Sequence, residues 1–428
     1  MKKILLLLLI PITIKVSAQK LTAKERKIID LINNQMPQTM ALLEDIVNIN
    51  SGTLNTQGVK KVGAVLKNEF DKIGFTTEWI TLPDSLKRAG HLVAHTKGEK
   101  GKKLFLIGHL DTVFEPDMEP NPYKKLNDST ATGQGVNDMK GGDMIILSAL
   151  KVLHQLGYLK NSFITAYFTG DEEKSGEPSS VSRADFIEKA KKCDIALGFE
   201  GANGLNTVAT ARRGSSQWQL TVTGKQAHSA GVFTSGYGSI YEASRIINTF
   251  REELSKEKYL TFNPGIFVGG ADVIYDSSKM QAIVSGKTNI ISPITYVQGD
   301  LRFLTEEQKN NARERMRNIA TTNNLGATSA KISFVDGIPS MEPTAGNDAL
   351  VGIISKVTTD MGIGSTNAGD PGSRGAGDIS YIAKYLDCLD GLGASGKGAH
   401  APGETLNLKE FPILIQRAAL LIYRLTRE

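Results

Sequence analysis

The chain is poor in cysteine, in histidine and in aromatic residues. Its 428 residues include two cysteines and six histidines, and aromatic residues make up 7%. Cys193 and Cys388 are too few to build a disulfide framework, although an oxidising compartment would permit one bridge between them. Both lie beside apolar runs typical of strands, so we expect two buried thiols. With 40% hydrophobic and 22% charged residues, the composition is that of a globular protein whose length suits two or three domains.

Long hydrophobic runs are also lacking, except at the N-terminus. Lysines precede an apolar core at residues 4–14, and small residues end the segment at Ala18. This order predicts a secretory signal peptide over residues 1–18 and hence a periplasmic or secreted protein. A membrane anchor is the alternative, but the run is shorter than the ~20 residues of a spanning helix and contains Pro11. We expect no membrane association after the signal is removed.

Neither sign of charge dominates the sequence. The formal net charge is +5, and lysines of the N-terminal segment carry three of these charges, which leaves +2 for the mature chain. So small an excess, without a cluster of basic and aromatic residues, gives no reason to expect nucleic-acid binding. Internal repeats and low-complexity linkers are absent from the sequence as well.

The periodicity of apolar residues predicts a layered α/β catalytic domain formed by residues 19–211 and 339–428. Buried strands that alternate with helices are typical of a largely parallel sheet. Residues 212–338 instead follow the order strand, helix, strand, strand, helix, strand, which predicts an inserted α+β sandwich that acts as a lid. Helices are expected at residues 21–49, 59–73, 141–156, 239–253, 306–323 and 410–425, and strands at 75–82, 91–96, 103–108, 163–169, 195–199, 217–223, 266–274, 295–304 and 330–335.

Acidic and histidine side chains follow the buried strands, at the edge where open α/β sheets bind their ligands. His109 and Asp111 follow one such strand, and residues two apart on a strand share a side. His109 can therefore bind a metal while Asp111 supports it, although a structural histidine explains this pair alone equally well. The acidic triplet at residues 171–173 follows another strand, where adjacent carboxylates repel unless cations or water surround them. Glu200 follows a third strand.

A glycine-rich stretch at residues 133–142 carries Asp138, and a second glycine-rich segment precedes His400. Glycines let the backbone approach closely, and the helix that begins near Gly141 directs its positive end toward Asp138. The stretch lacks the Gly-Lys-Ser/Thr ending of a phosphate loop and the spacing of a dinucleotide fingerprint. A plain turn is the remaining alternative for this motif taken alone.

These candidates together comprise two histidines and three or four carboxylates. The mixture of nitrogen and oxygen donors suits Zn2+ and contains too much histidine for calcium. Because one tetrahedral zinc needs fewer carboxylates, a two-metal site with one bridging carboxylate accounts for the surplus.

The order of the motifs resembles that of the aminoacylase and glutamate-carboxypeptidase family of dizinc exopeptidases, over essentially the whole mature chain. The matching residues are His109-x-Asp111, Gly135-x-x-Asp138-Met139-Lys140-Gly141-Gly142, Asp171-Glu172-Glu173, Glu200 and Gly398-Ala399-His400.

The resemblance implies two Zn2+ ions per subunit. Asp138 would bridge the two ions. His109 and Glu200 would complete one site, whereas Glu173 and His400 would complete the other.

The resemblance also assigns roles in catalysis. Asp111 would orient His109, and Glu172 would be the general base that passes a proton from the attacking water to the leaving amine. Zinc lowers the pKa of water to about 7 and polarises the scissile carbonyl, and a neighbouring carboxylate can then shuttle the proton. A glutamate at the position of Glu200 accompanies the carboxypeptidase or acylase branch of the family, whereas aspartate accompanies aminopeptidases.

In this family the inserted domain mediates dimerisation and supplies a histidine that contacts the substrate. Residues 224–230 match that element, so His228 is expected to stabilise the carbonyl or oxyanion, donated across a homodimer. Asn289 and Arg302 resemble lid positions that meet the substrate. Arg374 could pair with a substrate carboxylate, although a structural salt bridge explains this arginine equally well.

Some residues depart from the pattern or compete with it. Residues 337–341 lack the arginine that glutamate carboxypeptidases place there, so the substrate carboxylate is met elsewhere or is not that of glutamate. The spacing of His91 and His95 would suit zinc, but β structure with solvent-facing edges is the better interpretation. His154 lies in an expected helix and is interpreted as structural.

The leading hypothesis is an exported zinc exopeptidase of carboxypeptidase type that acts on a small peptide or an N-acyl amino acid. One alternative is a dipeptidase or aminopeptidase that uses the same metals. Another is a catalytically dead relative that binds zinc or small peptides.

Overall fold

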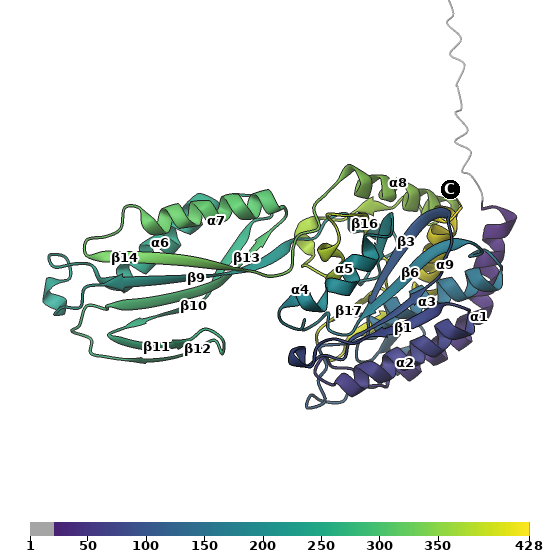
Figure 1. The fold of residues 1–428 in the computed structure, drawn as a ribbon, viewed down its shortest axis with the longest axis horizontal. Coiled ribbons are helices and arrows are strands. Elements are labelled where there is room, and N and C mark those ends of the chain that lie inside the picture. The colour runs from purple at the N-terminus through teal and green to yellow at the C-terminus, as the bar shows by residue number, and fades with distance from the viewer. Residues whose placement is uncertain (1–20, 428) are drawn as a thin grey trace, which may run out of the picture.

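The computed structural model describes residues 21–427, which form two lobes (Figure 1). The larger lobe contains both ends of the described chain, and the middle of the chain forms a smaller lobe that extends away from it. The expected fold class, an α/β catalytic domain with an inserted α+β lid, is confirmed. The expected signal peptide lies outside the described residues.

The larger lobe is built on a six-stranded mixed sheet in the order β1-β2-β6-β3-β7-β16. β6, β3, β7 and β16 run parallel, whereas β1 and β2 are antiparallel to their neighbours. The parallel strands therefore direct their carboxyl ends to one edge, where His109 pairs with Thr169. In sheet order the strands span Thr76–Ile80, His91–His95, Ser162–Thr169, Lys100–His109, Ile195–Gly198 and Asp387–Leu389.

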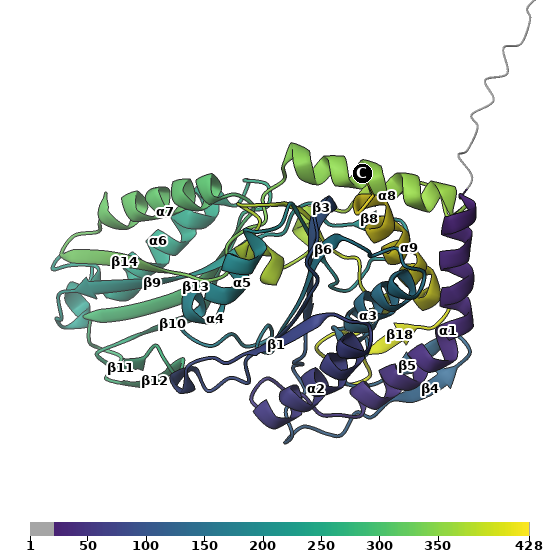
Figure 2. The same cartoon turned by 45° about the vertical axis from the view of Figure 1, so that its right-hand side comes forward.

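Helices cover both faces of this sheet because its strands are apolar on both sides. Leu104 and Leu106 of β3 pack in the main core with the long helices, whereas Phe105 and Ile107 pack in a second core with Phe186 of α5. α1, α3 and α9 lie side by side on the face of the sheet that forms the main core (Figure 2). The helices span Ala23–Val47 (α1), Thr56–Lys72 (α2), Lys140–Gln155 (α3), Ser179–Ser182 (α4), Ala184–Ala190 (α5), Ala345–Asp360 (α8) and Phe411–Leu425 (α9).

Two small sheets complete the larger lobe. One has the order β17-β18-β5-β4, with strands at Gly396–Lys397, Thr405–Asn407, Thr130–Thr132 and Lys124–Asn127. Because β18 pairs with β5, the loop between β17 and β18 lies beside the glycine-rich stretch that follows β5. This pairing brings His400 next to Asp138. The other small sheet pairs β15 (Asn367–Ala368) with β8 (Thr207–Val208).

The smaller lobe is a four-stranded antiparallel sheet in the order β10-β13-β9-β14, covered on one face by α6 and α7. Buried residues of β9 and β13, among them Trp218, Leu220 and Val297, form its core with these helices. The elements span Gly214–Gly224 (β9), Gly238–Leu254 (α6), Thr261–Gly270 (β10), Ile294–Phe303 (β13), Glu306–Thr321 (α7) and Thr328–Asp336 (β14).

The lid also contains a hairpin that was not expected. The prediction of one strand over residues 266–274 is wrong, because β10 ends at Gly270 and the chain continues into β11 (Asp272–Asp276) and β12 (Gln281–Ser285). A Cβ at Gly270 would lie 2.6 Å from Cγ1 of Val284, so any side chain there would force the hairpin residue Val284 to move.

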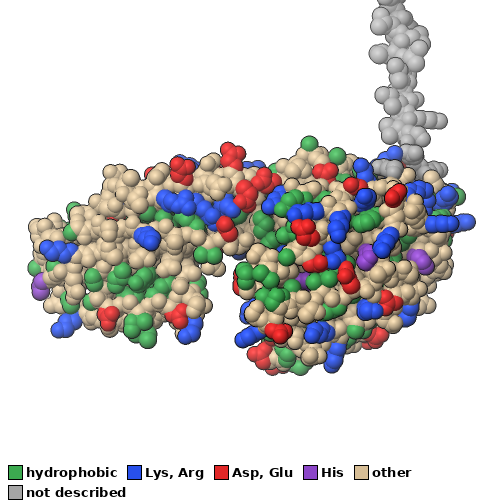
Figure 3. All heavy atoms as spheres, in the orientation of Figure 1, with side chains coloured by type: hydrophobic (Ala, Val, Ile, Leu, Met, Phe, Trp, Pro, Cys, Tyr) green, Lys and Arg blue, Asp and Glu red, His purple; other side chains and the backbone are tan. Residues whose placement is uncertain are grey.

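The chain passes between the lobes near Arg212 and Met341, which form an isolated antiparallel bridge. The surface view shows an open notch between the lobes, on the side where the hairpin lies (Figure 3). Within residues 21–427, no helix combines the length and the apolar character that crossing a membrane requires.

Candidate metal centre

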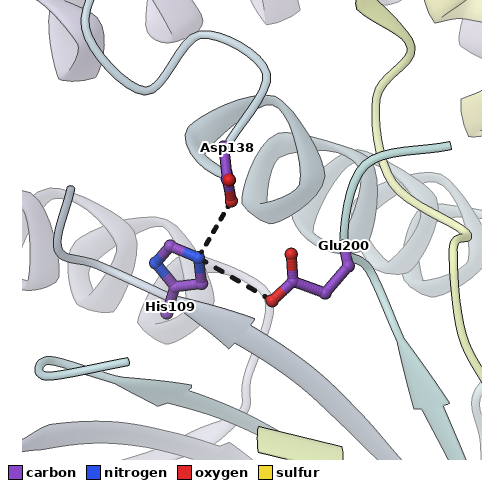
Figure 4. Close-up of side chains that lie close together, drawn as sticks. All are labelled: His109, Asp138 and Glu200. Carbon is purple, nitrogen blue, oxygen red and sulfur yellow. Dashed lines mark hydrogen bonds and ion pairs between the residues drawn. The ribbon is translucent and has the colours of Figure 1, made fainter. Parts of the chain in front are cut away.

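The five expected ligands meet at the carboxyl edge of the main sheet in two groups that could each hold a metal ion. His109 ends β3, Glu200 follows β7, and Asp138 lies in the loop before α3 (Figure 4). The second group contains Asp138 again, together with Glu173 and His400. In each group, the candidate ligand atoms lie within 4.8 Å of one another.

Asp138 presents one carboxylate oxygen to each group. Its Oδ1 lies 3.3 Å from Nε2 of His109, which is 3.9 Å from Oε1 of Glu200. Its Oδ2 lies 3.1 Å from Nε2 of His400, and that nitrogen is also 3.1 Å from Oε2 of Glu173. Tetrahedral ligands at 2.0–2.1 Å from a zinc ion are separated by about 3.3 Å. The spacing therefore fits two ions that share Asp138.

The buried carboxylates of this cluster also favour bound cations. Burial raises the pKa of Glu172 well above its ordinary value, and the charge of Glu200 adds to this. Burial and the neighbouring Asp138 raise the pKa of Glu200 to about 7. Oε1 of Glu173 is buried without a hydrogen-bond partner among the described residues. Bound cations would supply both the missing positive charge and a partner for this oxygen.

Asp111 supports the site in more ways than expected. Nδ1 of His109 lies 3.0 Å from the backbone oxygen of Asp111 and 3.4 Å from its carboxylate, so the main chain is the nearer acceptor. A proton on Nδ1 leaves Nε2 free to bind a metal. The carboxylate of Asp111 instead accepts hydrogen bonds from the backbone N–H groups of Glu172 and Glu173, at 3.0 and 3.1 Å. Asp111 thus joins the end of β3 to the acidic turn.

Glu404 was not anticipated, yet it holds the loop that carries Asp138. Its buried carboxylate accepts hydrogen bonds from the backbone N–H groups of Asn137 and Asp138, both at 2.7 Å, and from that of Gly135 at 3.1 Å. Burial raises the pKa of Glu404 to about 7, while the three N–H groups favour the ionised form. This one side chain therefore holds three backbone N–H groups of the loop at once.

Arg183 was not anticipated either, and it holds the acidic turn in place through buried ion pairs. The guanidinium is fully buried and donates to Asp171, at 2.5 Å, and to Asp378, at 2.7 Å. Asp171 also accepts hydrogen bonds from Ser182 Oγ and from the backbone of Gly176. The first member of the acidic triplet is therefore structural, and it positions the two glutamates that follow.

Two of the expected substrate contacts lie far from the metal cluster of their own chain. His228 pairs with Ile290, and Ser229 donates to the backbone oxygen of Asn289, at the end of the lid where β9 finishes. β9 has 11 residues and starts at the junction of the lobes, so it spans about 33 Å. Within one chain, this structure does not bring His228 and Asn289 to the metals.

The two expected arginines have different surroundings. Arg302 lies near the junction end of β13, and its Nε donates to Asp300 at 3.0 Å. Arg374 donates through Nη2 to the backbone oxygen of Gly201 at 2.7 Å, directly after Glu200. Burial lowers the pKa of Arg374 below its ordinary value, and nearby carboxylates offset this only in part.

The remaining histidine and cysteine predictions have separate outcomes. His91 is fully buried, with Nε2 3.0 Å from the backbone oxygen of Ser182, because β2 is an inner strand. The expectation of a solvent-facing edge is therefore wrong for His91. The expectation of two buried thiols is confirmed, because Cys193 and Cys388 are free and buried.

Residues 105–424 match the model of peptidase family M20/M25/M40. The chain belongs to this family. The expected kinship with dizinc exopeptidases is thereby confirmed. Members of the family are dinuclear zinc-type enzymes, and the chain is a metallo-exopeptidase or amidohydrolase of this kind.

Individual relatives extend over most of the chain. Carboxypeptidase G2 from Pseudomonas sp. (strain RS-16) is 28% identical over 394 residues, which cover 91% of this chain and 89% of the relative. A succinyl-diaminopimelate desuccinylase from Wolbachia pipientis wMel is 25% identical over 358 residues, covering 80% and 82%. The structure of aminopeptidase PepT from Bacillus cereus covers 90% of this chain and 98% of its own, with a TM-score of 0.73 and 18% identity. At that identity, the likeness to PepT shows the fold alone.

Proposed function

We propose that the chain is an exported, zinc-dependent exopeptidase of carboxypeptidase type that cleaves a peptide or N-acyl amino acid bond. The observation that carries this proposal is the pair of ligand groups that share Asp138, with Glu172 adjacent to them in the acidic turn. The N-terminal segment with the character of a signal peptide supports export to the periplasm or beyond the cell. The similarity to carboxypeptidase G2 supports the carboxypeptidase type.

The metal ligands follow from the two groups. His109, Asp138 and Glu200 would hold one zinc ion, and Asp138, Glu173 and His400 would hold the other. When bound, the ions would polarise the scissile carbonyl and lower the pKa of the attacking water.

Glu172 is the proposed general base. Its backbone N–H is fixed by Asp111, while its side chain lies near Glu200 and His109, whose charges act on its pKa. A carboxylate whose pKa is raised toward neutrality accepts a proton readily and can release it again to the leaving amine. The hydrogen bond to Asp111 keeps the base in a fixed relation to the strand that carries His109.

His228 is proposed to act across a homodimer formed through the lid. The span of β9 keeps His228 away from the metals of its own chain, so a partner's lid must supply this histidine. The lid offers a surface for such contact, because Phe233, Ile240 and Tyr241 are exposed around the start of α6, next to the edge strand β10. Asn289 would approach the substrate with His228, and Arg302 would meet it from the junction end of the lid.

The test combines metal analysis with a substrate panel. We expect zinc in the purified protein, hydrolysis of N-acyl amino acids or blocked dipeptides, and little action on amino-acid anilides, which aminopeptidases cleave. Glu172→Gln should lower kcat by about 100- to 10,000-fold with unchanged zinc content. Glu188→Gln, an exposed change on α5, is the matched control. Unchanged turnover in Glu172→Gln would rule out the assigned base, and cleavage of anilides alone would support an aminopeptidase instead.

A further inference from the structure

A short 3-10 turn places Arg374 against the metal cluster. The turn spans Pro371–Ser373, and Arg374 follows it in extended conformation. Nη2 of Arg374 donates to the backbone oxygen of Gly201, the residue after Glu200. A Cβ at Gly391 would lie 2.9 Å from the same nitrogen and 3.3 Å from Cζ, so the guanidinium lies against bare backbone. This contact holds the head group near the Glu200 side of the cluster.

Arg212 lies close by, but each of its three guanidinium nitrogens already donates a hydrogen bond. It donates to the Asp390 carboxylate and to the backbone oxygens of Gly375, at 2.6 Å, and Ala376, at 3.1 Å. Arg212 therefore neutralises Asp390 and anchors the segment directly after Arg374. Its charge is already paired with a carboxylate, unlike that of Arg374.

Arg374, in contrast, has carboxylates nearby, but none of those in the described residues directly contacts its guanidinium. Within residues 21–427, it forms no ion pair, and its hydrogen bond to Gly201 occupies one nitrogen. The expectation of a structural salt bridge therefore has no partner to support it among these residues. A half-buried guanidinium without an anion is unfavourable, and two planar N–H groups match a carboxylate in geometry and charge.

We propose that Arg374 binds the free carboxylate of the substrate, on the amino acid that leaves after hydrolysis. In such a substrate, the scissile carbonyl carbon of the acyl group and the carboxylate carbon of the leaving amino acid are about 3–4 Å apart. A receptor for that carboxylate must therefore lie directly beside the metals, as the contact with the residue after Glu200 places Arg374. This assignment rests on the proposed function and deepens it.

The proposal has a consequence for specificity. Residues 337–341 contain no arginine, and Arg302 is paired with Asp300 on its own strand. Arg374 is then the receptor for one carboxylate close to the scissile bond. The side chain of the leaving residue need not be acidic, so neutral N-acyl amino acids should be accepted.

The experiment uses matched pairs of N-benzoyl amino acids, each as the free acid and as its carboxamide. We expect the wild-type protein to prefer the acid by about 10- to 100-fold in kcat/KM, as a charged bidentate contact would give. Arg374→Gln keeps a donor for Gly201 and removes the charge, and it should abolish this preference through KM of the acid. Arg374→Lys should retain part of the preference, because it keeps the charge without the planar fork. Arg26→Gln, an exposed change on α1, should leave both kinetic constants unchanged.

Two results would overturn the assignment. One is a wild-type protein that hydrolyses acid and carboxamide equally well. This result would refute the role of Arg374 but not the proposed hydrolase function. The other is an Arg374→Gln variant that loses activity on both substrates in the same proportion, since that pattern belongs to a residue that only positions Glu200. Failure of the proposed function is distinguishable from both, because the wild-type protein would then hydrolyse neither member of any pair.

Discussion

Glu404→Gln tests how the loop that carries Asp138 is held in place. The change keeps the volume of the side chain and removes one acceptor beneath the loop. Oε1 of Glu404 accepts from Asn137 and Asp138, and Oε2 accepts from Gly135. The glutamine oxygen can keep the bonds from Asn137 and Asp138, but the NH2 group of the glutamine then faces the Gly135 N–H. Both of these donors are left without an acceptor.

The expected magnitude follows from this count. A buried donor without a partner costs about 1–3 kcal/mol, and the two remaining bonds lose the assistance of the negative charge. Because the metals need the Asp138 loop in its ordered position, part of this cost reappears as weaker zinc binding, by about 10- to 100-fold. Glu404→Ala removes all three acceptor contacts and should weaken binding further.

Zinc affinity would be measured by competition with a chelator of known strength, and kcat would be followed at saturating zinc. Glu119→Gln, an exposed glutamate, is the control for loss of a surface charge. If Glu404→Gln bound two zinc ions as tightly as the wild type and kept its kcat, the loop would not depend on Glu404.

Further predictions concern the buried arginine and the metals. Arg183→Met should lower the free energy of unfolding by about 3–5 kcal/mol in urea titrations, since two buried aspartates lose their partner, whereas Lys191→Met on the surface should not. Despite burial, Arg183 keeps the pKa of Asp171 below its ordinary value, so this stabilisation is present above about pH 4 and is lost as the pH falls through the folded-state pKa. The free energies of unfolding of the wild-type protein and of Arg183→Met should therefore converge in acid. EDTA should abolish hydrolysis and lower the unfolding temperature, and added zinc should restore both.

Much of the metal cluster was predictable because its residues follow buried strands. The strand that ends at His109 and the strand before Glu200 are apolar runs that periodicity reveals, and parallel strands bring their carboxyl ends to one edge. His400 has no such strand before it. It reaches Asp138 because β18 pairs with β5, a long-range contact that motif order indicates but periodicity does not.

The residues that were missed share a different property. Glu404 and Arg183 act on backbone groups and on other side chains across the fold, and neither occupies a strand end or a periodic position. A single glutamate in a loop looks solvent-exposed in the sequence, and its burial depends on which loops the small sheet brings together. In the hairpin at residues 272–285, β11 was missed because it merges with β10 into one apolar stretch, and β12 is a short exposed strand for which no strand was expected.

The position of His228 leads to a test of the dimer that needs no structure of it. His228→Ala and Glu172→Gln should each inactivate a homodimer, because the first removes the partner's contribution and the second removes the base. In a mixed dimer, the site that keeps Glu172 receives an intact His228 from the other subunit. Random pairing makes half of the dimers mixed, each with one complete site of two, so co-expressed variants should recover about one quarter of the wild-type activity. If His228 served the metals of its own chain, every site would carry one of the two defects, and the mixture would remain inactive.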